Sequence, residues 1–168
     1  MSGAMTYRGL DPEAVLAMRR ARLERHLGRP LVAPRGRPMP PERRRFLREE
    51  GEELYWNELA WEKLTPRDAS AGEDVVEHAF PGFLAFISGL LLRGAGTGAA
   101  AGPRTEVVED IMLFLARRCI ESVTSDDEEA LCERRLTERL LDEVLYRFYD
   151  LRAEEVERLE RLRTGAAG

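Results

Sequence analysis

The stretch AFPGFLAFISGLLL, residues 79–92, carries no charge in a 168-residue chain of which 34% is charged. If it is helical, steps of about 100° per residue give it one bulky side and one small side. The bulky side comprises Phe80, Phe83, Leu84, Ile87 and Leu91, and the small side comprises Gly82, Ala85 and Gly89. A helix that is apolar all round must be covered on every side. We therefore predict an all-α bundle in which a helix beginning at Phe80 and ending at Leu92 is central, with its small side in close contact with a neighbouring helix.

The same stretch is too short to span a bilayer, which takes about 20 apolar residues in a helix. It contains fourteen residues, and His78 and Arg93 close it at its two ends. We expect a buried helix here and no association with a membrane.

Length and charge divide the chain into an arm and a body. A chain of this length suits one domain with an appendage. Residues 1–48 hold twelve arginines and four carboxylates, a net charge of +8, whereas the whole chain has −5, which leaves −13 for the remainder. We predict a basic N-terminal arm over residues 1–40 and a bundle of about four to five helices over residues 41–168.

The arm itself is predicted to be a short helix followed by a linker. Asp11 before Pro12 is typical of a helix start, and Gly28 before Pro30 is typical of a helix end. The helix should therefore extend over Pro12–Leu27. Residues 28–41 contain five prolines and two glycines, which predicts an extended linker rather than a helix or a central strand.

Helix-start and helix-end residues also divide the body. We expect helices over Pro41–Leu64, from Gly72 to a break at Pro81, over residues 80–92, over residues 105–123, and from a Ser125–Glu128 capping box onward. Residues 94–103 should form a glycine-rich connector. The last helix either breaks near Asp150 or runs to nearly forty residues and extends beyond the domain; the sequence leaves both open.

Two tryptophans fall in the second of these helices, at Trp56 and Trp61. Periodic aromatic residues usually face a core, so we interpret both as core anchors. The alternative is an aromatic binding surface. With His78, which we expect at the edge of the core and half-buried, the two tryptophans also define a candidate small-molecule pocket.

The residues that catalysis requires are scarce. The chain has two histidines and two cysteines, and no Glu-x-x-His pair of the kind that di-iron bundles use. Short zinc-ligand spacings, a Walker sequence and a Gly-x-Ser-x-Gly elbow are also missing from the sequence. We expect no catalytic residues, no metal and no cofactor, and we interpret Cys119 and Cys132 as free thiols in a reducing compartment.

The arginines of the arm and of the next helix are candidate contacts for an acidic surface or another anion. They are Arg19, Arg20, Arg22, Arg25, Arg43, Arg44 and Arg45. A segment of charge +8 next to a body of −13 should pair with it, in the same chain or across a dimer. Nucleic acid is the less favoured partner, because few aromatic residues interleave with these arginines for stacking on bases.

These features together favour a non-enzymatic interaction or scaffold protein of a bacterial cytoplasm, with a homo-oligomer, preferably a dimer, as its expected state. Its protein partner is not identifiable from the sequence. One alternative is a nucleic-acid-binding protein that uses the arginine-rich arm. The other is a helical bundle that binds a small molecule near Trp56, Trp61 and His78.

Overall fold

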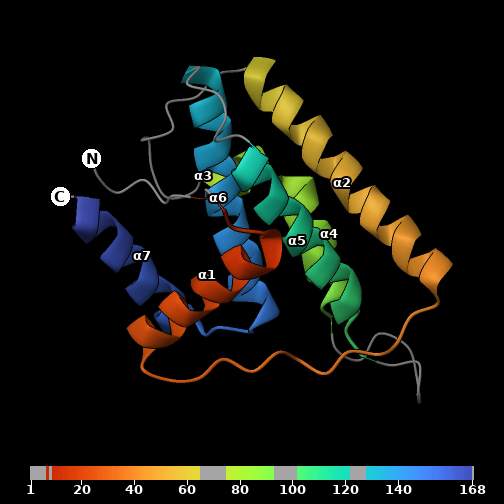
Figure 1. The fold of residues 1–168 in the computed structure, drawn as a ribbon, viewed down its shortest axis with the longest axis horizontal. Coiled ribbons are helices and arrows are strands. Elements are labelled where there is room, and N and C mark those ends of the chain that lie inside the picture. Colours follow the sequence, from red (N-terminus) through yellow and green to blue (C-terminus); the bar gives the residue numbers. More distant parts are fainter. Residues whose placement is uncertain (1–6, 8, 65–74, 93–101, 122–127, 168) are drawn as a thin grey trace.

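The computed structural model describes the backbone of residues 7, 9–64, 75–92, 102–121 and 128–167, and all regular structure in this part of the chain is helical (Figure 1). The helices are α1 (Pro12–Leu27), α2 (Pro41–Leu64), α3 (Val75–Ala79), α4 (Pro81–Leu90), α5 (Thr105–Glu121), α6 (Glu128–Phe148) and α7 (Ala153–Ala167). The prediction of an all-α bundle is confirmed; among the described residues from 41 onward there are six helices, α2–α7, rather than four or five. No helix in these ranges is long and apolar enough to cross a membrane.

The ends of α1 follow from its sequence. The Asp11 side chain accepts a hydrogen bond of 2.8 Å from the backbone N–H of Ala14, which satisfies a donor that the first turn would otherwise leave unpaired. Gly28 ends the helix in the left-handed conformation, at φ 70°, where a side chain would be strained. The predicted bounds of α1 and of α2 are both confirmed.

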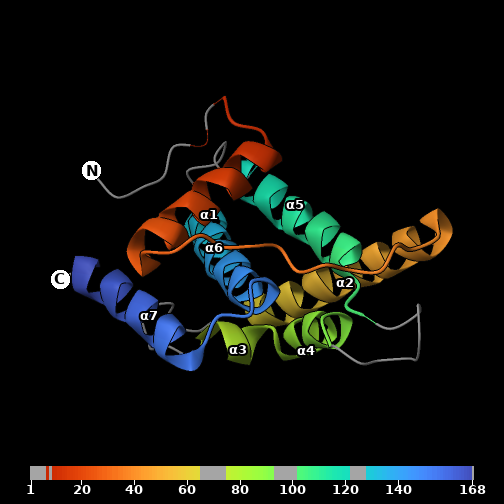
Figure 2. The same cartoon turned by 90° about the horizontal axis from the view of Figure 1, so that it is seen from below.

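The helices α4 and α5 each pack against four others: α5 contacts α1, α2, α4 and α6, and α4 contacts α2, α3, α5 and α6. Figure 2 shows α1 on one side of α5 and α6, and α3 with α4 on the opposite side. The helices α2 and α7 lie at the two flanks. The α5–α6 pair forms the most extensive helix contact, and α4, the helix of the uncharged stretch, packs against both of these helices and against α2 and α3.

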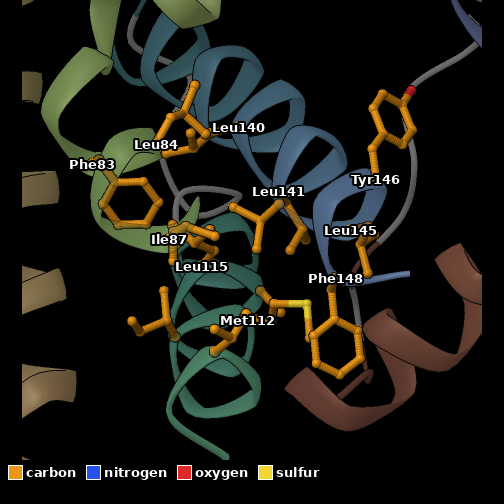
Figure 3. Close-up of a cluster of buried hydrophobic side chains, with 14 of the residues drawn as sticks. Phe83, Leu84, Ile87, Met112, Leu115, Leu140, Leu141, Leu145, Tyr146 and Phe148 are labelled. Atoms are coloured by element: carbon orange, nitrogen blue, oxygen red, sulfur yellow. The ribbon is translucent and has the colours of Figure 1, made fainter. Parts of the chain in front are cut away.

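Side chains from α4, α5 and α6 form the densest part of the core and point toward one another (Figure 3). Fully buried members are Phe83, Ile87, Ile111, Leu115, Leu140, Leu141 and Val144. A buried leucine or phenylalanine contributes about 1.5 to 3 kcal/mol relative to an exposed one. The bulky side of the uncharged stretch is thus where the sequence predicts it.

The small side of that stretch is not covered, and the expectation that it forms a helix contact is wrong. Ala85 and Gly89 are exposed, and a Cβ placed on Gly89 would meet no atom within 4 Å. Glycine and alanine present little apolar area, so their exposure costs little free energy. At the start of α4, the Glu58 carboxylate accepts hydrogen bonds of 2.8 Å from the backbone N–H groups of Gly82 and Phe83. A side chain from α2 therefore caps α4.

The close helix contact occurs instead at Gly51, in the buried side of α2. A Cβ at this position would lie 2.7 Å from Cδ1 of Ile111 and 3.2 Å from Cε2 of Phe86. The missing side chain therefore lets α2 approach α5 and α4 closely. This packing offsets the cost of about 1 kcal/mol that a glycine imposes inside a helix relative to alanine.

The segment between α1 and α2, residues 28–40, forms no helix or strand after the turn at Gly28, as its prolines predict, and it runs along one end of the molecule (Figure 1). It is fixed to the body at several points. Leu31 is fully buried, and the backbone N–H groups of Arg37 and Met39 donate to the Pro103 carbonyl and the Glu106 carboxylate at 3.2 and 3.0 Å. The segment links α1 to the start of α5. The arm and body boundary at residue 40 stays a prediction, while α1 adds Val15 and Leu23 to the same buried cluster.

The last helical region breaks at Asp150, which settles the question that the sequence left open. Asp150 has φ 52°, in the left-handed region, and the N–H of Leu151 donates to the Tyr146 carbonyl at 3.0 Å. This is how many helices end. After the break α7 packs against α1, so it does not extend beyond the bundle as one long helix. The predicted Ser125 cap, the residues before α3 and most of the glycine-rich connector lie outside the described residues.

The two glycine environments give a paired test of the packing. Gly51→Leu should lower the free energy of unfolding by about 1 to 3 kcal/mol or more, because the side chain overpacks the contact with Ile111. Gly89→Leu enters open space and replaces a poor helix former, so it should leave stability unchanged or raise it by up to about 1 kcal/mol. Denaturant unfolding of both variants measures the difference, and equal effects at the two positions would contradict this arrangement.

Candidate docking surface on α2

The helix α2 lies at a flank of the bundle and is buried on one side only. Leu47, Tyr55 and Leu59 face the core, where the Tyr55 ring stacks on Phe80 with 5.7 Å between ring centroids. Tyr55 also shares a hydrogen bond of 2.7 Å between its hydroxyl and that of Thr137. These contacts fix the rotation of α2 about its own axis, and so determine which of its side chains face outward.

Three large aromatic side chains face outward as a result. Phe46 is 58% exposed, Trp56 is 45% exposed and Trp61 is 63% exposed. The carboxylates of Glu49, Glu50 and Glu53 are exposed among them, and no ion pair joins any of the three to another described residue. We call these six residues the aromatic face of α2. Exposed aromatic patches with a polar rim are typical of protein interaction sites.

Trp56 is held in a defined position within this face. The guanidinium carbon of Arg118 lies 4.4 Å from the centre of its ring, and the ring makes edge contacts with Tyr55 and Phe114. An arginine over a tryptophan ring stabilises by about 0.5 to 1 kcal/mol at an exposed site. The surface therefore presents an ordered aromatic side chain, which loses little conformational entropy when a partner covers it.

The interpretation of both tryptophans as core anchors is wrong, because both are exposed. A helix at a flank has neighbours on one side only, so aromatic residues at its other positions face solvent. His78, which we expected to be half-buried, is also exposed. A cleft of about 590 Å³ between α3, α4, α6 and α7 is lined by none of Trp56, Trp61 and His78. The candidate pocket at these three residues stays a prediction.

Among the candidate arginines, Arg44 contacts the acidic body at the start of α5. Its guanidinium donates two hydrogen bonds to the Asp110 carboxylate, at 2.7 and 2.8 Å, and one to Glu106 at 3.3 Å. A second two-pronged contact joins Arg29 in the linker to Glu155 of α7, at 2.7 and 2.9 Å. Arginine presents its N–H groups as a planar fork, which matches a carboxylate in this way.

Arg19 of α1 is buried in a polar cluster against α6. It donates to Asp142 at 2.9 Å and to the Tyr7 hydroxyl at 3.1 Å, and Tyr7 in turn donates to Glu138. Burial is the largest single influence and would lower the pKa of Arg19, but the Asp142 carboxylate together with Tyr7 and Cys119 outweighs it, so the pKa is raised. Arg19 therefore remains charged within the fold.

The remaining candidate arginines have other surroundings. Arg20 donates to the Leu31 carbonyl and lies over the Tyr149 ring at 5.7 Å. Arg43 lies over the Phe46 ring at 5.8 Å. Arg22, Arg25 and Arg45 are exposed, and the structure shows no ion pair between them and any described residue.

The two clefts described are lined mainly by charged side chains. The cleft of about 590 Å³ is rich in carboxylates, and a second, of about 310 Å³ between α7 and the end of α1, is rich in arginines; neither is lined by a cysteine or a histidine. Burial raises the pKa of the Cys119 thiol to about 12, so it is protonated at neutral pH and a poor nucleophile. No three His, Cys, Asp or Glu side chains in the described ranges are arranged to hold a metal ion.

Reasoning from the sequence did not identify the acidic partners of these arginines. A signal was present, because Glu106 and Asp110 are four residues apart, as are Glu138 and Asp142, each pair beside the apolar stripe of its helix. Two carboxylates one turn apart would repel each other unless a cation lay between them. No pattern in the sequence indicates that Tyr7 is buried.

No family model, curated protein or solved structure matches this chain.

The Arg19 cluster can be tested against an exposed ion pair. Asp142→Ala should destabilise the protein by about 2 to 4 kcal/mol, because it leaves a buried guanidinium without its nearest carboxylate. Glu157→Ala, which breaks an exposed pair with Arg161 at 3.8 Å, should cost less than about 1 kcal/mol. The double variant Arg19→Met/Asp142→Leu should be more stable than Asp142→Ala alone. Equal melting of Asp142→Ala and the parent in thermal unfolding would contradict the buried pair.

The lowered pKa of Glu155 predicts that the free energy of unfolding falls at acid pH. Hydrogen bonds from Arg29 hold its pKa at about 2, below the usual 4.5. A carboxyl whose pKa is lowered by folding stabilises the fold above its unfolded pKa and loses that effect as the pH falls through the folded value. Glu155→Gln should therefore be less stable than the parent at neutral pH, and the difference should shrink between about pH 4.5 and about pH 2. Denaturant unfolding across this range measures it; a difference independent of pH would contradict the assignment.

Proposed function

We propose that the protein is a non-enzymatic helical interaction protein that self-associates, preferably as a dimer, through the aromatic face of α2. The observation that supports this function is the exposure of three large aromatic side chains, Phe46, Trp56 and Trp61, along one helix. Single exposed apolar residues are common, whereas three large exposed aromatic residues on one helix are not. Tryptophan and its neighbouring arginine are also the residue types that contribute most to protein interfaces.

The chemistry of the described residues supports a binding role over an enzymatic one. The Cys119 thiol is buried and protonated, and neither cleft contains a histidine or a cysteine. Burial raises the pKa of the Glu143 carboxyl in the first cleft, and Arg147, which donates a hydrogen bond to it, opposes this effect. A general base or a nucleophile needs a suitable pKa and access to a substrate. The aromatic face offers a surface for packing without such groups.

The two alternatives from the sequence have less support. Arg19, Arg29 and Arg44 already bind carboxylates, so a phosphate backbone would have to displace these contacts. A small-molecule site near Trp56, Trp61 and His78 would have to form on an exposed surface. The free thiols of Cys119 and Cys132 fit the proposal that the protein acts in a bacterial cytoplasm, where cysteines stay reduced.

Native mass spectrometry with sedimentation analysis tests the proposed function. The parent should have about twice the monomer mass at high micromolar concentration, and Trp61→Glu should shift it to the monomer mass while its thermal unfolding stays within a degree or two of the parent. Val32→Glu is the matched control, because Val32 is 77% exposed but lies in the linker. This control should remain a dimer.

A parent that stays monomeric at this concentration would contradict self-association. A tightly retained small molecule in the same spectra would favour the ligand-binding alternative. Salt-sensitive binding of mixed DNA or RNA would favour the nucleic-acid alternative.

A further inference from the structure

The middle of the aromatic face of α2 carries three carboxylates, whereas the exposed Arg43 and Arg45 lie at its N-terminal end beside Phe46. A partner that covers the middle of this face must therefore supply positive charge. The three carboxylates have no ion pair among the described residues, and they lie between the exposed rings at positions 49, 50 and 53. Covering them with an apolar surface would strip water from three charges without compensation, which is costly. The occupant of this face is therefore a cationic surface with apolar groups among its charges.

The exposed side of α1 has this composition. Ala17, Met18, Ala21, Arg22 and Arg25 are exposed and fall three and four residues apart, on one stripe of the helix. Met18 is 43% exposed, and Arg22 and Arg25 have no ion pair with any described residue. We call these five residues the basic face of α1. From Met18 to Arg25 this face extends over seven residue steps along the helix, the same length as from Phe46 to Glu53 on the aromatic face of α2.

Contacts within the molecule show that this pairing is chemically suitable. Three arginines lie over aromatic rings, namely Arg118 over Trp56, Arg43 over Phe46 and Arg20 over Tyr149, at 4.4 to 5.8 Å from the ring centres. Arginine also pairs with carboxylates across helices, as in Arg44 with Asp110. Arg22 and Arg25 could make both kinds of contact with a surface that alternates glutamate with tryptophan.

On the basis of the proposed self-association, we infer that the basic face of α1 in one copy docks on the aromatic face of α2 in a second copy, with the contact repeated across a two-fold axis. Docking of α2 against its own copy is disfavoured, because an antiparallel pair centred on the face would bring Glu53 against the same residue of the other chain. A reciprocal α1–α2 contact places opposite charges together instead. Repetition doubles the buried area, toward the roughly 1,600 Å² typical of specific complexes.

Charge reversal on each face tests this inference. Arg22→Glu/Arg25→Glu and Glu50→Arg/Glu53→Arg should each raise the dimer dissociation constant by at least about tenfold at low ionic strength. Combining all four substitutions restores opposite charges at both contacts, so the dissociation constant should return to within about threefold of the parent. Sedimentation equilibrium gives the constants, and the parent dimer should weaken as salt is added.

Matched controls separate charge from folding. Arg35→Glu/Arg135→Glu makes the same change in net charge at two exposed arginines outside both faces, and it should dimerise like the parent. Arg22→Ala/Arg25→Ala avoids placing acids at the end of α1, and it should also weaken the dimer, by less than the reversal. Circular dichroism should show parent-like helix content for every variant.

The outcomes distinguish this inference from the proposed function. If Trp61→Glu dissociates the dimer while Arg22→Glu/Arg25→Glu does not, the aromatic face is an interface but α1 is not its partner. If the four-substitution variant remains dissociated, charge pairing between the two faces is overturned. If the parent is a monomer, both the inference and the proposed self-association are overturned.

Discussion

The buried ion pair between Arg19 and Asp142 is the constraint on which the position of α1 depends. The apolar seam of α1 is thin, with Val15, Leu23 and Leu27 as its buried members. Nonpolar contacts of this kind are not directional, so they would allow α1 to slide or rotate on α5. A guanidinium fixed between α6 carboxylates and the Tyr7 hydroxyl allows one register. Since a buried ion pair need not add net stability, its contribution here is to specify the position of α1.

The fixed position of α1 decides which helices are covered. With α1 on α5 and beside α7, the linker passes the start of α5, where Arg44 and Met39 contact Asp110 and Glu106. Residues 28–40 thus cover an end of the bundle and not the outer side of α2. The exposure of the aromatic face of α2 is a consequence of this route, and so is the basic stripe left on the outer side of α1.

Sequence patterns predicted where helices begin and end, but not which of their sides are buried. Caps and helix-breaking residues act within a few positions along the chain, which is why Asp11, Gly28 and Pro81 gave correct bounds. Burial depends on neighbours distant in sequence.

The stripe of Gly82, Ala85 and Gly89 is compatible with either a tight contact or open solvent, and periodicity cannot separate the two. At Gly51 the same ambiguity had the opposite outcome, because Ile111 of α5 happens to lie against it. For the tryptophans of α2, periodicity likewise could not tell core from solvent, and both are exposed because α2 has neighbouring helices on one side only.

The uneven distribution of charge along the chain likewise does not show by itself which partners the arginines bind. A net charge of +8 over residues 1–48 invites a polyanion as its partner, yet the arginines with the most restrictive geometry, Arg19, Arg29 and Arg44, bind carboxylates of the same chain. Two-pronged contacts of this type require a fixed direction of approach, whereas a phosphate backbone mainly requires accessible charge. The arginines that remain accessible on α1, Arg22 and Arg25, are few and lie beside Met18 and two alanines. A surface with two charges among apolar groups is suited to a folded partner that has both glutamates and aromatic rings, and among the described residues the outer side of α2 has this composition.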